Sequence, residues 1–506
     1  MAATDTVPTA GPVRDAAAPP ATLSPIESRI IWLLLAAAFV AILNETTMGI
    51  AIPRLIVDLG ITAVAAQWLT TAFMLTMAVV IPITGFLLRR FTTRQMFIAA
   101  MSLFSLGTLI AFLSPGFPML LVARVVQASG TAIMMPLLMT TIMNVVPPQS
   151  RGRMMGRVSI VISLAPAIGP SLSGFLIDTV GWRWNFGVVL PIALVALAVG
   201  AIWIRNLGET THAPIDVISV ILSAFGFGGL VYGLSQIGGA AEAHGGTAAE
   251  AATASTTATV SLIVAFSVGV LALALFAWRQ VRLQRSDDAL LDLRVFTFRN
   301  FSFATGHMTL LSAAFFGIIT VLPLYAQNVV GLDPFMSGLI VLPGALAMGL
   351  AGPIVGRIYD RYGTRVLLVP GTVIAVGMLW VFTTFTATTP VWAIAVGQTA
   401  LSIGLALSFT PLFTASLASL DRKYYSYGSA VVGTVQQVAG AAGIALFITV
   451  MSSVQSAVEA AGAPDAGAQG AHAAFLLAAI VSIPLLFSAF LVRKPADEGL
   501  PIPAAH

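Results

Sequence analysis

The 506-residue chain contains no cysteine, and only 9% of its residues are charged. The absence of cysteine excludes disulfides, thiolate metal sites and thiol nucleophiles. The only lysines, Lys423 and Lys494, lie outside any GxxxxGK[ST] phosphate loop, so we do not expect ATP hydrolysis. HExxH and GxSxG motifs and clusters of histidine are also absent from the sequence. We therefore expect no enzyme, no metal site and no cofactor.

The composition is strongly apolar, with 58% hydrophobic residues and a mean hydropathy of +0.96. A soluble protein has about 25% charged residues. The apolar segments are continuous over ~20 residues, whereas the strands of a membrane β-barrel alternate over ~10. The sequence therefore predicts an all-α integral membrane protein. The basic pI near 9.7 does not indicate a nucleic-acid partner, because the basic residues lie in short loops between apolar segments.

The sequence predicts fourteen transmembrane helices. The segments are 30–52, 66–88, 95–113, 117–143, 156–178, 185–204, 215–236, 258–278, 301–328, 334–355, 366–386, 391–419, 427–454 and 471–492. An even number of spans places both termini on one side. With that side cytoplasmic, 21 of the 24 Lys and Arg residues fall inside, the exceptions being Arg54, Arg124 and Arg183. We expect a multi-pass protein of the cytoplasmic membrane with both termini in the cytoplasm.

An internal repeat relates the two ends of the chain. The loop GFLLRRFTTR (85–94) reappears as GRIYDRYGTR (356–365), 271 residues later. The same offset maps Pro82 onto Pro353, Gln127 onto Gln398 and Gly169 onto Gly440. Two homologous six-helix halves in parallel orientation are typical of the major facilitator architecture.

The repeat divides the chain into five parts. They are a disordered cytoplasmic tail (1–28), an N-terminal bundle (29–205), a two-helix insertion with its linker (206–300), a C-terminal bundle (301–494) and a cytoplasmic tail (495–506). The first tail lacks the pattern of a cleaved signal peptide. Within the insertion, the Gly/Ala/Thr-rich stretch 237–257 is expected to be a flexible external loop.

Glu45 is a carboxylic acid well inside the first predicted span. An ionised carboxylate in hydrocarbon costs ~2.5 kcal/mol or more, so this side chain should pair, face a cavity or take up a proton. We hypothesise that Glu45 binds and releases a proton and that the other helices couple this exchange to solute movement. The alternative is a permanently protonated structural acid held by hydrogen bonds.

Five motifs resemble those of the fourteen-span drug:proton antiporters of the major facilitator superfamily, a family of bacterial multidrug exporters. The resemblance covers residues 29–494. The motifs are LNETTMGIAIP (43–53), LVARVVQASGTA (121–132), APAIGPSLSG (165–174), GWRWNF (181–186) and GRIYDRYGTR (356–365).

The resemblance implies roles in proton coupling for Glu45, where the family usually has Asp, and for Arg124. Arg124 and Gln127 match the motif RxxQGxG, with Ala128 in place of its first glycine. Arg124 is expected to interact with Glu45 or its neighbourhood. Alternatively, Arg124 only donates to backbone carbonyls at a helix end.

The fifth-span motif is associated with antiporters, and here it includes Gly169, Pro170 and Gly174, with Ser173 replacing an expected glycine. Small residues allow helices to approach closely and proline kinks a helix, so the motif is expected to seal a helix interface when the cavity closes on one side. Ordinary small-residue packing is the alternative.

The two repeat loops resemble the facilitator loop motif GxxxDRxGxR, which the resemblance implies forms a cytoplasmic latch. The second copy matches it well, whereas in the first Arg89 stands where Asp is usual and Thr92 where Gly is usual. The first latch is therefore absent or uses another acid, or its charges only set topology. The candidate gating residues are Arg89, Arg90, Arg94, Gly356, Asp360, Arg361, Gly363 and Arg365.

The lining of a substrate cavity is predicted from span positions alone. Methionine and aromatic side chains suit varied lipophilic substrates, although each is also a normal packing residue. The candidates are Met48, Gln127, Met134, Met135, Phe315, Phe316, Tyr325 and Gln327.

Four other residues allow structural explanations. His307 either takes part in proton transfer or is a hydrogen-bonded core residue. Asp216 is expected at a helix start, and Trp182 and Trp184 at an outer membrane interface.

These observations together predict a proton-coupled secondary exporter of lipophilic, and in one version cationic, drugs. Its expected partners are protons, small lipophilic substrates and membrane lipids, and it is expected to be a monomer. Two alternatives remain. One is a transporter of the same mechanism that exports an endogenous solute or lipid, and the other is a membrane sensor or scaffold that does not transport.

Overall fold

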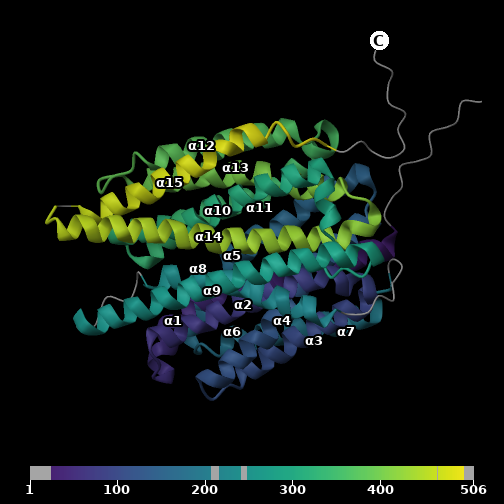
Figure 1. Ribbon diagram of the computed structural model, residues 1–506, viewed down its shortest axis with the longest axis horizontal. Helices are drawn as coiled ribbons and strands as arrows, with labels where there is room; N and C mark the ends of the chain where they lie inside the picture. Colours follow the sequence, from purple (N-terminus) through teal and green to yellow (C-terminus); the bar gives the residue numbers. More distant parts are fainter. Residues whose placement is uncertain (1–23, 207–215, 241–247, 464, 495–506) are drawn as a thin grey trace, which may run out of the picture.

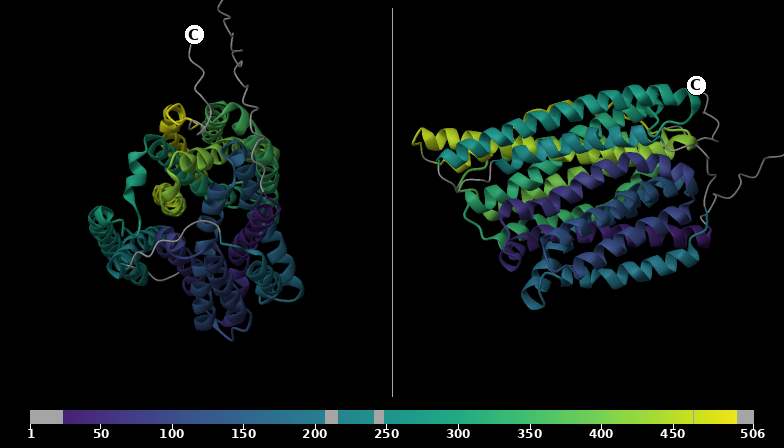
Figure 2. Two further views of the ribbon diagram at one scale, coloured as in Figure 1. Left: turned by 90° about the vertical axis from the view of Figure 1, so that its right-hand side faces the viewer. Right: turned by 60° about the horizontal axis from the view of Figure 1, so that its bottom comes forward.

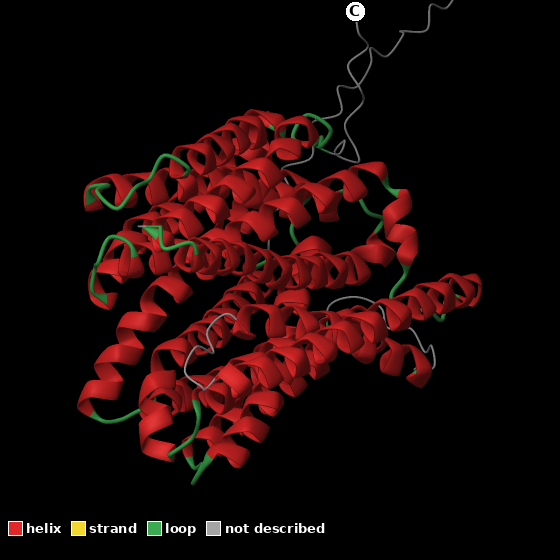
Figure 3. Cartoon of the chain, turned by 60° about the vertical axis from the view of Figure 1, so that its left-hand side comes forward, coloured by secondary structure: helices red, strands yellow, loops and turns green. Residues whose placement is uncertain are grey.

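The computed structural model describes residues 24–206, 216–240, 248–463 and 465–494. These residues form helices joined by short loops, with no strand among them (Figure 3). Fourteen segments are long and apolar enough to cross a membrane, as predicted. The C-terminal tail and most of the N-terminal tail predicted from the sequence lie outside the described residues.

The helices follow the predicted order of two six-span halves separated by a hairpin. In the N-terminal half, α6 and α7 together make one span; the helices are α1 (Pro25–Leu59), α2 (Ala63–Arg90), α3 (Thr93–Phe112), α4 (Phe117–Val145), α5 (Arg151–Thr179), α6 (Trp184–Gly187) and α7 (Val189–Trp203). The hairpin is α8 (Val217–Ala240) and α9 (Ala248–Leu283). The C-terminal half is α10 (Arg299–Asn328), α11 (Pro334–Tyr362), α12 (Arg365–Phe382), α13 (Val391–Ala418), α14 (Tyr425–Ala460) and α15 (Ala466–Ser488). Short 3-10 turns are η1 (Pro148–Ser150), η2 (Gln284–Ser286), η3 (Leu293–Thr297) and η4 (Arg422–Tyr424).

Two predicted boundaries are wrong. Helix α1 begins at Pro25, inside the predicted tail, because Ser24 and Glu27 form a capping box that satisfies backbone N–H groups at the first turn. Of the predicted loop 237–257, residues 241–247 lie outside the described residues and the rest is helical, since α8 continues to Ala240 and α9 starts at Ala248. Alanine is the strongest helix former, which explains why this stretch extends α9.

The two halves lie side by side, and the hairpin lies against their seam (Figures 1 and 2). Helix α1 packs mainly against α5, α4 and α7, and α10 packs mainly against α14, α15 and α13, so the first helix of each half packs mainly within its own half. Helix α8 packs against α2 of the first half and α14 of the second. The insertion therefore covers one side of the contact between the halves.

We call the end of the bundle where α1 begins and α15 ends the terminal face, which is on the right in Figure 1. The halves are joined near this face by two hydroxyl pairs, Thr140–Ser429 at 2.8 Å and Ser159–Thr410 at 2.6 Å. Since α4 and α13 are repeat equivalents, as are α5 and α14, the internal symmetry relates the two pairs.

The tightest contact between the halves is made by glycines of α5 and α11. A Cβ atom on Gly156 would lie 2.2 Å from the carbonyl oxygen of Gly352, and one on Gly356 would lie 2.1 Å from that of Gly152. Each helix thus presents a GxxxG pattern to the other, which allows the two backbones to touch. This contact closes the bundle at the terminal face.

Candidate functional site

Glu45 lies near the middle of α1, between the half-buried Thr46 and the buried Asn44, and its own side chain is half-buried. Within the described part of the chain, its carboxylate has neither a hydrogen-bond partner nor a salt bridge. Arg124 of α4 is close enough to interact with it electrostatically. Glu45 is thus an acid in a membrane-spanning helix whose charge is not neutralised by direct contact.

Arg124 is fully buried and is held by several groups of the N-terminal half. Its Nη1 donates to Gln127 Oε1 at 2.7 Å and, more weakly, to Asn44 Oδ1 at 3.5 Å. Its guanidinium lies 4.1 Å from the ring centroid of Phe73 on α2, an arrangement that favours a cation. Arg124 is therefore fixed in place while it contacts the residue next to Glu45.

Gln127 extends this network to a third helix. Its Nε2 donates to Thr108 Oγ1 of α3 at 2.8 Å, and Thr108 in turn donates to the carbonyl of Phe104. Helix α3 comes close enough because Gly107 packs directly on the backbone of Gln127, where a Cβ would lie 2.5 Å from its nitrogen. The sequence analysis placed Gln127 in the substrate cavity, but the structure has it fully buried in this network.

The α5 motif that resembles the antiporter signature contacts α1 next to Glu45. A Cβ on Gly169 would lie 2.2 Å from Thr46 Oγ1, so only glycine allows this approach. Ser173 Oγ donates to the carbonyl of Thr47 at 2.9 Å and accepts from Asn185 Nδ2 at 3.0 Å. The serine that departs from the family motif therefore adds a polar tie between α5 and the segment of α1 that carries the acid.

Pro170 lies in the interior of α5, and Gly174 faces open space, with no atom within 4 Å of a Cβ built there. Gly174 lines a shallow groove of about 470 Å³ at the end of α1 and α5 remote from the terminal face. Within the motif, Gly169 and Ser173 make the interface with α1, and Gly174 does not.

The loop motif of the second half joins the two halves at the terminal face. Asp360 accepts from the backbone N–H groups of Gly152 (2.7 Å) and Arg153 (2.8 Å), and thereby caps the first turn of α5. A carboxylate at a helix N-terminus satisfies unpaired donors and interacts favourably with the helix dipole. Lys494 Nζ donates to the carbonyl of Asp360 at 3.1 Å.

Other members of the loop motif hold the local structure. Arg365 donates to the carbonyl of Phe490 at 2.7 Å, and Arg361 lies over the ring of Tyr362. Gly363 has a φ of +82°, in the region that favours glycine, and ends α11. Gly356 is the α5 contact described above.

The first-half copy of the motif makes a different contact. Arg89 Nη1 donates to the hydroxyl of Tyr427 on α14 at 2.7 Å, and that hydroxyl donates to the carbonyl of Ala289 in the linker before α10. Arg94 donates to the carbonyl of Ala201, a contact like that of Arg365, and Arg90 lies over the Phe91 ring. In the first half, the arginine that stands in place of the usual aspartate therefore contacts a tyrosine of α14.

Acids of the linker lie close to this contact. Arg294 bonds both Asp287 and Asp292, and the hydrogen bond from Arg294 is the main reason that the pKa of Asp287 is lowered. The positive charge of Arg89 lowers it further. The prediction that another acid substitutes in the first latch thus finds a candidate in Asp287.

Three of the other seven predicted cavity residues are buried by packing. Met48 and Met134 lie in hydrophobic clusters, and Tyr325 donates to the carbonyl of Thr386 while it packs on Phe385 and Phe475. Phe315 and Phe316 are half-buried and pack on each other, and Phe315 also packs on Phe409. Met135 and Gln327 are half-buried.

His307 and Asp216 have structural contacts. Both ring nitrogens of His307 are near hydroxyls, Ser488 at 2.8 Å and Thr372 at 3.5 Å, in the interior of the second half. Asp216 immediately precedes α8 and binds Arg279 of α9 through both carboxylate oxygens, at 2.6 and 2.8 Å. The hydrogen bond from Arg279 lowers the pKa of Asp216, so this ion pair ties the hairpin together at the terminal face.

Sequence reasoning missed Asn44, Phe73, Thr108 and Ser173 as members of the site. Asn44 had a signal, because it is the polar neighbour of Glu45 within a membrane span. Phe73, Thr108 and Ser173 could be found only by knowing which helices face Arg124 and α1. The sequence pattern of a single helix does not contain this information.

Comparison with known proteins agrees with this architecture. The family model described as Major Facilitator Superfamily matches residues 34–444. The lincomycin resistance protein LmrB of Bacillus subtilis is 38% identical over 92% of this chain and 95% of its own length. The multidrug resistance protein B homolog of Mycobacterium tuberculosis is 30% identical over 82% of this chain and 74% of its own length.

A solved structure shares the fold. The human organic anion transporter MFSD10 (TETRAN) covers 92% of this chain and 100% of its own, with a TM-score of 0.62 at 13% sequence identity. Together with the family match and the bacterial relatives, the fourteen spans lead to one conclusion. The chain belongs to the major facilitator superfamily and is a membrane transporter.

Proposed function

We propose that this transporter is a proton-coupled exporter of lipophilic drugs that works by alternating access as a monomer in the cytoplasmic membrane. The observation that carries the proposal is the carboxylate of Glu45, which has no hydrogen-bond partner in the described part of the chain and lies near the fixed cation of Arg124. Burial penalises its charge and the nearby cation favours it, so small changes in water access or helix position shift the proton.

Arg124 gives the proton a structural consequence. When Glu45 is ionised, it attracts the guanidinium that Asn44 and Gln127 hold, and when it is protonated the attraction ends. Helix α5 contacts α1 at Thr46 and Thr47 through the motif that resembles the antiporter signature. A change in the attraction between Glu45 and Arg124 is therefore transmitted to this motif. These contacts form the physical link between protonation and the movement of helices in the proposed mechanism.

The positive-inside pattern supports a cytoplasmic location for the terminal face. The halves are joined at this face by the Asp360 cap and the glycine contacts, so we interpret the structure as closed to the cytoplasm. In such a state an exporter releases its substrate outside and takes up a proton there. The free energy available from proton entry is about 2.3 kcal/mol per charge for each 100 mV of membrane potential. The pH gradient adds about 1.4 kcal/mol per pH unit.

The name of the Bacillus relative makes lincomycin a first substrate to test, alongside the cationic dye ethidium. The experiment is efflux from energised vesicles that contain the wild type, Glu45→Gln or Glu45→Asp. Wild type and Glu45→Asp should respond to the proton gradient, whereas Glu45→Gln should lose at least tenfold of the gradient-driven rate. Undiminished gradient-driven efflux by Glu45→Gln would exclude Glu45 from the mechanism.

A further inference from the structure

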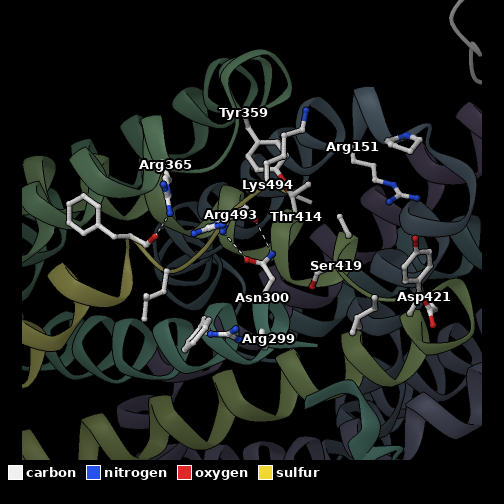
Figure 4. Close-up of a pocket in the computed structure, with 17 residues that line it drawn as sticks. Arg151, Arg299, Asn300, Tyr359, Arg365, Thr414, Ser419, Asp421, Arg493 and Lys494 are labelled. Carbon is white, nitrogen blue, oxygen red and sulfur yellow. Dashed lines mark hydrogen bonds between the residues drawn. The ribbon is translucent and has the colours of Figure 1, made fainter. Parts of the chain in front are cut away.

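A second cavity, of about 620 Å³, opens at the terminal face and is separate from the Glu45 site (Figure 4). It lies among the ends of the helices of the second half, with walls from the starts of α10 and α12 and the ends of α11, α13 and α15. Pro148 and Arg151 complete it from the first half. The cavity is therefore shared by the two halves.

The cavity is strongly basic. Its lining includes one carboxylate, Asp421, against five cations: Arg151, Arg299, Arg365, Arg493 and Lys494. Arg299 and Arg493 are exposed, and neither forms a salt bridge with an acid among the described residues. The positive-inside rule explains why basic residues occur at this face, but it does not explain why five converge on one cavity.

The cations are held in position by other groups. Arg151 donates to the carbonyls of Val146 and Met143, and Arg365 donates to that of Phe490. Carbonyl acceptors fix a guanidinium without neutralising its charge. Asn300 accepts from the backbone N–H of Arg493 and donates to its carbonyl, which anchors the segment after α15 that carries Arg493 and Lys494 beside α10 (Figure 4).

These features favour a phosphate-bearing anion. Guanidinium groups bind phosphate oxygens through paired N–H donors, and the hydroxyl of Tyr425 in the lining offers a further donor. The volume exceeds that of one phosphate, and Phe303 and Phe490 supply an apolar wall for an organic part. The place of the cavity, at the ends of spanning helices, is the level at which anionic phospholipid headgroups meet basic pockets.

We propose that this cavity is a binding site for a phosphate ester anion and that its occupant stabilises closure of the terminal face. Arg151 belongs to α5 and Tyr359 is adjacent to Asp360, the residue that caps α5. A ligand that contacts both Arg151 and the cations of the second half adds a bridge between the halves in this state. When the halves separate at this face, Arg151 moves away and the bridge is lost.

The test measures ligand binding to the full-length protein, so its outcome does not depend on the proposed transport function. Native mass spectrometry with phosphatidylglycerol, phosphatidylcholine or glycerol 3-phosphate compares wild type with the double variant Arg299→Gln/Arg493→Gln. The matched control is Arg282→Gln/Arg285→Gln, which removes the same charge from exposed residues outside the cavity at the end of α9 and in η2. Thermal melts of all three proteins confirm that they fold.

The double variant should weaken binding of the phosphate probe by about 30-fold, and the control should change it less than about threefold. Binding of phosphatidylglycerol but not glycerol 3-phosphate identifies a lipid headgroup, and equal binding of both identifies a soluble phosphate ester. Absence of binding, or equal weakening by the double variant and the control, would overturn the proposed site.

The effect on closure is tested with spin labels at Phe91→Cys and Tyr362→Cys, repeat-equivalent exposed positions on the terminal face. The native chain has no cysteine to remove. The bound phosphate probe should shift the distance distribution toward shorter values in the wild-type background and not in the double variant. An unchanged distribution would refute the stabilisation of closure even if the anion binds.

Discussion

At the scale of single residues, polar side chains decide how Glu45 is coupled to the bundle. Glu45 has no direct partner in the described residues, but its neighbours Asn44, Thr46 and Thr47 contact Arg124, Gly169 and Ser173, respectively. In the proposed mechanism, a proton that binds to Glu45 therefore acts on surroundings that are already connected to α4 and α5. The replacement of a motif glycine by Ser173 strengthens one of these connections.

The Ser173 contact predicts a measurable stability effect. Ser173→Ala removes the donor to Thr47 and the acceptor of Asn185, and should lower the free energy of unfolding by about 0.5–1.5 kcal/mol. Ser129→Ala is the control, because that hydroxyl donates to Val125 within its own helix. Denaturation in mixed micelles measures both. Equal effects of the two substitutions would contradict the interhelical role of Ser173.

At the scale of helices, the two latches differ because their neighbours differ. The repeat offset of 271 residues places Tyr427 at the position of Gly156, and Lys423 at that of Gly152. Glycines let α5 approach α11 until Asp360 reaches its backbone N–H groups. Tyr427 instead occupies the space between α2 and α14, and Arg89 donates to its hydroxyl. An arginine at position 89 thus suits the tyrosine that faces it.

The glycine contact should control closure of the terminal face. In Gly156→Ala, the new methyl group would lie 2.2 Å from the Gly352 carbonyl oxygen, so α5 and α11 must separate. The Phe91→Cys/Tyr362→Cys label pair should then report longer distances. Gly306→Ala, where a Cβ meets no atom within 4 Å, is the control and should leave the distances unchanged. An unaltered distribution in Gly156→Ala would show that this contact does not hold the face closed.

At the scale of the whole molecule, the two six-helix halves are related by pseudo-symmetry, but the insertion and its linker make contacts that break this symmetry. Helix α8 packs on α2 and α14, and the linker accepts a hydrogen bond from Tyr427. Helix α8 and the linker both lie near the loop motif of the first half, in which Arg89 replaces the usual aspartate. The basic cavity is lined mainly by the second half, with Pro148 and Arg151 from the first, and lies beside the loop motif in which Asp360 is present. The two sides of the terminal face therefore close through different chemistry.

The orientation of the whole molecule can be tested with single cysteines in the native cysteine-free chain. Phe91→Cys on the terminal face should react with a membrane-impermeant thiol reagent only after the cells are opened. Ala387→Cys, exposed in the loop between α12 and α13, should react in intact cells. The reverse labelling pattern would place the terminal face outside and would contradict the proposed direction of transport.

Much of the fold was predictable because the hydrophobic length of each segment and the internal repeat can both be recognised directly in the sequence. The fourteen spans and the two halves follow from such patterns, whereas the contact of Arg124 with the neighbourhood of Glu45 was expected from the resemblance of their motifs to those of a known family. The cavity residues were harder, since a methionine such as Met48 has the same sequence pattern whether it faces a cavity or a neighbouring helix. The α5–α11 glycine contact also depends on helix pairing, which periodicity alone does not specify.

The most direct test of the central claim separates substrate movement from proton coupling. In proteoliposomes, Glu45→Gln should still exchange labelled substrate across the membrane when no gradient is imposed, because the permanently neutral side chain permits the halves to move. It should fail to accumulate substrate when a pH gradient is imposed, whereas wild type accumulates it. Accumulation by Glu45→Gln at the wild-type level would contradict the account.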